Sequence, residues 1–150
     1  VLHAVRRSMF RRQERHSFAV GASGVPFLTF GWSAPENWGS WNNGFRAKLQ
    51  LPGRGKYGSW RVGLAVTVFG REGESRPVQI RVGDDGPELR WNLVANTVTQ
   101  KELDVRFAGD DVAVRVAVPG AVSPFALGKS ADHRRPGLGL IEMRMSYLGS

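Results

Sequence analysis

The residues best suited to chemistry are tryptophans in one loop-like stretch. Trp32, Trp38 and Trp41 fall within ten positions of a segment rich in Gly, Ser, Asn and Pro. Large apolar side chains exposed on a loop lower solubility unless they pack or bind something. They could plug the open end of the fold, with indole N–H groups bonded to backbone carbonyls. They could equally form a platform on which the C–H face of a sugar stacks. The sequence leaves both alternatives open, and they are compatible.

Polar side chains accompany these tryptophans and extend the predicted site. Glu36 and Asn42 are suited to bonding sugar hydroxyls. In a second loop, Asp132 and Arg134 suggest a carboxylate–guanidinium clamp that pins the chain before its last strand, with a ligand contact of the arginine as the alternative. The predicted ligand-binding residues are Trp32, Glu36, Trp38, Trp41, Asn42, Asp132 and Arg134.

Catalytic chemistry finds little support in the residue types. A Ser–His–Asp triad would need His3, His16 or His133; the first two lie in a basic arm, and arginines beside the third disfavour an imidazolium. The acidic pairs at 84–85 and 110–111 adjoin glycines, where turn formation accounts for them. A structural Ca²⁺ is the remaining use for these carboxylates, whereas three histidines and no cysteine exclude zinc. We expect no catalytic site and no cofactor.

The elements that would position the site are strands. Of the 150 residues, 41% are hydrophobic and 23% charged, as in a soluble globular domain. Residues 45–51 alternate between apolar and polar side chains, which is typical of a half-buried strand. No helical pattern follows residue 16, so parallel βαβ units are excluded. We predict an all-β fold, an antiparallel β-sandwich of the jelly-roll, galactose-binding-like type. Strands are expected at 18–20, 26–30, 45–51, 60–69, 78–82, 88–93, 100–107, 112–118 and 138–147.

Positive charge is concentrated at the beginning of the chain. Residues 1–16 hold five arginines and one glutamate, half of the net charge of +8. Their pattern suggests a short helix, either a connection from an upstream domain or a segment that binds an anionic membrane or polyanion. We divide the chain into a basic arm (1–17) and a sandwich domain (18–150). The first residue is Val, so we expect a piece of a longer protein. No apolar run is long enough to cross a membrane.

Two ordered motifs resemble those of a known family. The first comprises Gly31-Trp32, Pro35-Glu36, Trp38-Gly39 and Trp41, and the second runs from Ser123-Pro124 to Leu138-Gly139. They resemble the opening and closing motifs of an uncharacterised β-sandwich module appended to bacterial glycosyltransferases and other envelope-polysaccharide proteins. The resemblance covers about residues 18–148 and implies a jelly roll similar to carbohydrate-binding sandwiches. Pro136 departs from it, because an apolar residue such as Leu often stands there.

The function predicted from these features is binding without catalysis. We expect an accessory module that holds a glycan for a polysaccharide-assembling enzyme to which it is attached. One alternative is a structural module that docks onto its own catalytic domain and has no ligand; a largely buried Trp loop would favour it. A polyanion or nucleic-acid binder is the third, although no recognised nucleic-acid motif is present. The lack of cysteine leaves the compartment open between bacterial cytoplasm and envelope.

Overall fold

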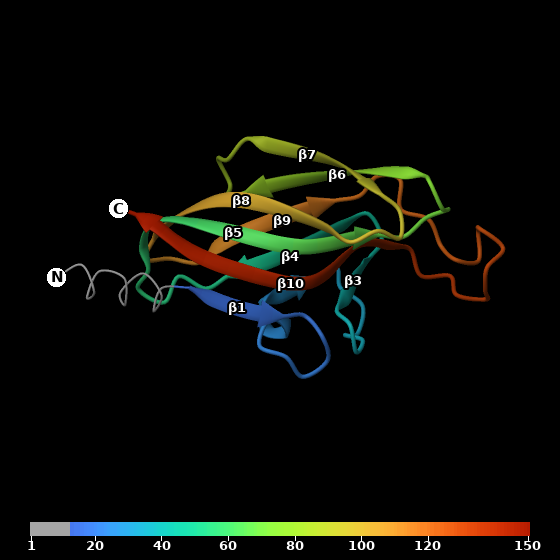
Figure 1. Ribbon diagram of the computed structural model, residues 1–150, viewed down its shortest axis with the longest axis horizontal. Coiled ribbons are helices and arrows are strands. Elements are labelled where there is room, and N and C mark those ends of the chain that lie inside the picture. The colour runs from blue at the N-terminus through green and yellow to red at the C-terminus, as the bar shows by residue number, and fades with distance from the viewer. Residues whose placement is uncertain (1–12) are drawn as a thin grey trace.

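The computed structural model describes residues 13–150, which form two antiparallel β-sheets packed face to face (Figure 1). Sheet A has the order β1-β10-β5-β8, with β3 also paired to β10, and sheet B has the order β2-β4-β9-β6-β7. The predicted all-β antiparallel sandwich is therefore confirmed. Sheet A consists of β1 (Glu14–Ser17), β3 (Ser40–Asn43), β5 (Tyr57–Val68), β8 (Thr99–Ala108) and β10 (Pro136–Gly149). Sheet B consists of β2 (Leu28–Phe30), β4 (Arg46–Leu51), β6 (Ser75–Val82), β7 (Glu88–Val94) and β9 (Val112–Ala117), and a short 3₁₀ helix, η1 (Val25–Phe27), precedes β2.

Strand β4 shows how the sequence pattern sets the faces of sheet B. Ala47, Leu49 and Leu51 are buried against sheet A, whereas Arg46 and Lys48 point outward. Successive side chains of a strand point to opposite faces, so this alternation places one row in the core and one in solvent. The outer face of sheet B is consequently polar.

Strands β5 and β10 form the middle of sheet A. Residues 64–68 of β5 are all buried, as predicted for a strand covered on both faces. The prediction was wrong for the first part of its range, 60–69, where exposed Arg61 shows that one face meets solvent. In β10 the register shifts between Leu140 and Glu142, so Ile141 forms a bulge. Because a one-residue insertion exchanges the two faces, Leu140 and Met143 both point into the core.

The N-terminal prediction needs a correction where the structure describes it. Glu14–Ser17, assigned from sequence to the basic arm, form β1 and pair antiparallel with β10, Glu14 opposite Met145. A helical pattern over residues 14–16 is therefore wrong, because backbone pairing with the edge of β10 makes this segment extended. The rest of the predicted arm, residues 1–12, lies outside the described part of the chain. Within residues 13–150 no helix has the length and apolar character of a membrane span.

Candidate functional site

Three aromatic rings gather at the end of sheet A where β3 meets β10. The rings of Trp38 and Trp41 pack edge to face with centroids 5.0 Å apart, and Trp41 packs edge to face on Phe69 at 6.4 Å. Because Ser40 and Asn42 on either side face the core with no exposed surface, Trp41 points outward from sheet A. It rests on Gly139, where an added Cβ would come 2.9 Å from Cζ3 of the indole. Trp38 and Trp41 stay half-buried, so this aromatic cluster (Trp38, Trp41, Phe69) retains accessible ring surface.

One charged side chain contacts the aromatic cluster, and a second precedes it in sequence. Lys129 places its Nζ 5.7 Å from the ring centroid of Phe69, a cation–π distance. Glu36 lies in the turn that leads to Trp38, and its backbone N–H donates to the carbonyl of Gly39 at 2.8 Å. Oε2 of Glu36 is buried, and no group in residues 13–150 bonds to it. This oxygen is therefore an unsatisfied acceptor.

The predicted clamp between Asp132 and Arg134 is formed. Nη2 of Arg134 lies 2.7 Å from Oδ2 of Asp132, and the backbone N–H of Arg134 donates to Oδ1 at 2.9 Å. These hydrogen bonds lower the pKa of Asp132 below its usual range and raise the pKa of Arg134, to which the nearby charge of Glu36 also contributes. The clamp fixes the loop between β9 and β10, which extends from one end of the sandwich (Figure 1), and brings its guanidinium toward Glu36.

Two predicted site residues have structural contacts instead. Trp32 packs on the core and its Nε1–H donates to the carbonyl of Lys48 at 2.9 Å, as the plug alternative predicted. Asn42 has no exposed surface: Nδ2 donates to the carbonyl of Gly44, and Oδ1 accepts from the backbone N–H of Leu138. Since both polar ends of its amide are bonded to backbone, we remove Asn42 from the candidate binding residues.

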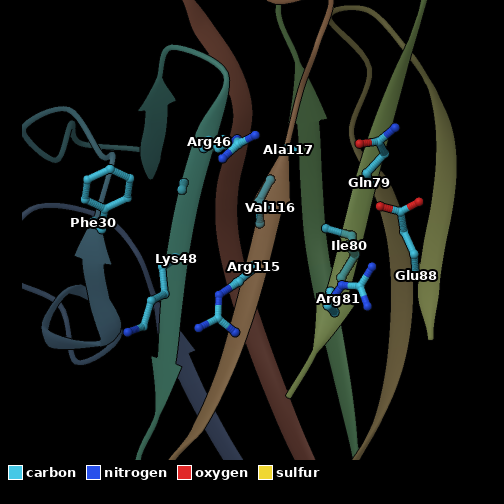
Figure 2. Close-up of a pocket in the computed structure, with 11 residues that line it drawn as sticks. Phe30, Arg46, Lys48, Gln79, Ile80, Arg81, Glu88, Arg115, Val116 and Ala117 are labelled. Atoms are coloured by element: carbon cyan, nitrogen blue, oxygen red, sulfur yellow. The ribbon is translucent and has the colours of Figure 1, made fainter. Parts of the chain in front are cut away.

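A second surface, which sequence reasoning missed, is a shallow groove of about 410 Å³ on the outer face of sheet B (Figure 2). Phe30, Lys48, Arg115, Arg81 and Glu88 form one row across all five strands, each residue being the register partner of the next. The sequence did contain a signal for this surface, because cations occupy the polar positions of strands in which apolar and polar residues alternate. Their alignment depends on strand register, however, which the sequence does not give.

The groove is electrostatically uneven. Arg115 bonds to Asp84 at 2.6 Å, and Arg81 donates to the carbonyl of Gly86 at 3.2 Å. For Arg46 and Lys48 no carboxylate lies within 4.0 Å among the described residues. The groove therefore carries cations that the protein itself leaves uncompensated.

The structure also brings together a serine, a histidine and a glutamate, the side-chain types of a hydrolytic triad. His16 bonds through Nδ1 to Oγ of Ser23 at 2.9 Å and through Nε2 to Glu14 at 3.0 Å. The sequence did not predict this arrangement, because His16 was assigned to the basic arm. Glu14 is shared with Lys56, whose Nζ lies 2.8 Å from Oε1, so its charge is already compensated. The N–H of Gly24, next to the serine, donates to Ser17 and is not free to bind an oxyanion. We interpret the group as fixing β1 rather than as catalytic.

Two of the acidic side chains considered as calcium ligands make contacts within the fold instead. Asp111 accepts from the backbone N–H of Gly53 at 2.8 Å, and Asp84 pairs with Arg115. Across the part of the chain that the structure describes, no three side chains of the metal-ligating types come together. No metal site is therefore assigned.

No protein-family model matches the chain, and no curated protein matches it in sequence. Solved structures of similar fold include carbohydrate-binding modules. The family 35 module from Clostridium thermocellum has 13% identity and a TM-score of 0.53, over 89% of this chain and 98% of that chain. The CBM35 module from Paenibacillus barcinonensis has 11% identity and a TM-score of 0.51, over 90% and 99%. The C-terminal CBM6 of a marine laminarinase from Zobellia galactanivorans has 8% identity and a TM-score of 0.51, over 89% and 98%. At such identities the similarity is one of fold, the jelly-roll sandwich.

Proposed function

We propose that this chain is a non-catalytic glycan-binding module and that the aromatic cluster is its sugar platform. The observation that carries the proposal is the half-exposed Trp38–Trp41 pair. Glu36, whose carboxylate has an unbonded oxygen, lies two residues before Trp38 in the chain. Apolar surface flanked by a few convergent polar groups is the usual composition of small-ligand sites. Pyranose rings suit it because their C–H faces are apolar and their rims carry hydroxyls.

Fold similarity supports the same proposal from a different direction. The three similar structures are all named carbohydrate-binding modules. One fold hosts many functions, so fold similarity supports the proposal and the site residues carry it. Within the site, Glu36 would accept from a sugar hydroxyl and Arg134, held by Asp132, would donate to one.

A glycan array followed by calorimetry tests the proposal. We expect the full chain to bind a defined glycan and the variants Trp38→Ala and Trp41→Ala to lose at least tenfold in affinity, about 1.4 kcal/mol. Phe125→Ala is the matched control, because Phe125 is an exposed aromatic of the neighbouring loop, stacked on His133 outside the cluster. Circular dichroism verifies that each variant is folded. Retained binding in folded Trp variants, or an equal loss in Phe125→Ala, would refute the platform.

A second proposal concerns the larger protein to which this module is attached. We infer from the motif resemblance that the module belongs to a polysaccharide-assembling protein that carries a glycosyltransferase. Weak binding next to a catalytic domain raises the effective concentration of a chain end. Deleting the module from such a parent enzyme should lower the use of polymeric acceptors and leave short acceptors unaffected. Equal loss for both acceptor lengths would contradict the tether and favour a docking role.

A further inference from the structure

The outer face of sheet B carries charge in a pattern that strand pairing disfavours. Lys48 and Arg115 are direct register partners, and so are Arg115 and Arg81. Figure 2 shows the three side chains on the neighbouring strands β4, β9 and β6. Like charges directly opposite each other on one face destabilise a sheet. Three such cations abreast therefore call for an anionic partner.

Sheet A provides an internal comparison. Its exposed Arg61 has Asp104 as register partner, with Nε 3.4 Å from Oδ1, and lies 3.6 Å from Glu102. This is how a solvated sheet face usually places its charges, each cation beside an anion. On sheet B one carboxylate, that of Asp84, pairs with Arg115, and Lys48 has none within 4.0 Å in the described chain. Sheet A also has arginines without a carboxylate within 4.0 Å among residues 13–150, Arg106 and Arg144, and one like-charged register pair, Arg15 and Arg144. The groove differs in placing three cations abreast in one row.

The groove has the shape and the chemistry of a site for a linear polymer. Strands of a sheet lie about 4.8 Å apart, so Lys48, Arg115 and Arg81 span roughly 10 Å in a line across them. Arg46 lies one row away on β4, and Ala117 of β9 separates it from Gln79 of β6 in the lining of the same groove. A chain that crosses the strands would meet a cation on each of β4, β9 and β6.

We propose that this groove binds a carboxylated glycan, a uronate-containing polysaccharide that lies across the strands of sheet B. The planar guanidinium matches a carboxylate through two parallel hydrogen bonds, and Lys48 adds a point charge. Phe30, which is 63% exposed, closes one end of the row as a surface for a sugar ring, and Glu88 at the other end can accept from hydroxyls. The proposal goes beyond the aromatic cluster and does not require that cluster to bind glycan.

The same residues argue against nucleic acid as the occupant. Proteins that bind single strands without sequence preference stack successive bases on several aromatic rings. Phe30 is the one aromatic residue among those that line the groove in the described chain. A glycan with spaced carboxylates therefore fits the groove better than a phosphate backbone.

The test uses the full chain with polygalacturonate as the probe and its fully methyl-esterified form as the uncharged counterpart. We expect salt-sensitive binding of the acid form alone, and about tenfold weaker binding by the double variant Arg46→Gln/Lys48→Gln. The control is Arg61→Gln/Arg106→Gln, which removes the same charge from exposed positions of sheet A and should retain binding within about twofold. Since residues 1–12 are identical in both variants, their arginines cannot produce the difference.

Other outcomes would overturn the proposal in distinguishable ways. Equal loss in both double variants would mean that net charge, and not the groove, drives binding. Equal binding of the methyl ester would mean that carboxylates are not recognised. Tight binding of oligo-dT that depends on Arg46 and Lys48 would assign the groove to nucleic acid. Trp38→Ala should leave polygalacturonate binding intact, so failure of the groove and failure of the aromatic platform are separate results.

Discussion

Asn42 gives the sharpest test of the structure, because the sequence suggested a ligand contact and the fold assigns it a structural one. Its amide joins the turn after β3 to the first residues of β10: Nδ2 donates to the carbonyl of Gly44 at 3.0 Å, and Oδ1 accepts from Leu138. Both Asn42 and Leu138 are fully buried. Replacing Asn42 with Ala therefore removes two hydrogen bonds and leaves a buried N–H that water cannot reach.

The magnitude follows from these contacts. A net hydrogen bond contributes about 1 kcal/mol, and a buried donor left without a partner costs about 1–3 kcal/mol. We expect Asn42→Ala to lower the free energy of unfolding by about 2–4 kcal/mol. At roughly 3 °C per kcal/mol for a chain of this size, Tm should fall by about 6–12 °C.

The assay is urea unfolding followed by tryptophan fluorescence, with Asn43→Ala as the matched control. Asn43 is the exposed neighbour, and its Oδ1 accepts one bond, from the backbone N–H of Arg135 at 3.0 Å. The control should lose no more than about 1 kcal/mol. Equal losses for the two variants would refute the structural role of Asn42, and a loss of glycan affinity at unchanged stability would restore its predicted ligand contact.

Two further predictions concern the ends of sheet A. Partial burial raises the pKa of Glu14, but hydrogen bonds from His16 and Lys56 outweigh it and hold that pKa below its ordinary value of 4.5. The ionised Glu14 therefore stabilises the fold above pH 4.5, and this stabilisation is lost as pH falls through the pKa of the folded state. In urea unfolding, Glu14→Gln should be less stable than wild type at neutral pH and equally stable in strong acid. Gly139→Ala would bring a Cβ within 2.9 Å of the Trp41 ring. The near-ultraviolet circular dichroism should therefore change and glycan affinity should fall. An unchanged spectrum would contradict the packing of Trp41 on Gly139.

The sandwich was predictable because a two-residue period reports directly on which face of a strand is buried. In β4 the alternation of Ala47, Lys48 and Leu49 is the alternation of core and solvent. The pattern failed at Ile141, where a bulge exchanges the faces of β10 and the continuous apolar run conceals it. It failed also at β1 and β3, which are too short to display a period and are held by pairing with β10.

The candidate site was predictable in part for an equally physical reason. Three tryptophans in a Gly-rich loop are a local signal, and two of them, Trp38 and Trp41, do come together with accessible surface. The role of Trp32 depends on a carbonyl of β4, sixteen residues away. The cationic row depends on the register of strands distant in sequence, such as Lys48 against Arg115. Composition marks these residues as unusual, but it does not tell which of them are neighbours.

The two candidate surfaces lie on opposite outer faces of the sandwich, and this separation gives their tests independent meaning. Trp41 points outward from sheet A because its neighbours Ser40 and Asn42 face the core, while Lys48 points outward from sheet B because Ala47 and Leu49 do. The buried layer between them contains no residue common to both surfaces. Effects of substitutions without shared partners add, so a change at one face should leave intrinsic affinity at the other unaltered. A glycan long enough to reach both would gain from effective concentration and not from a new contact.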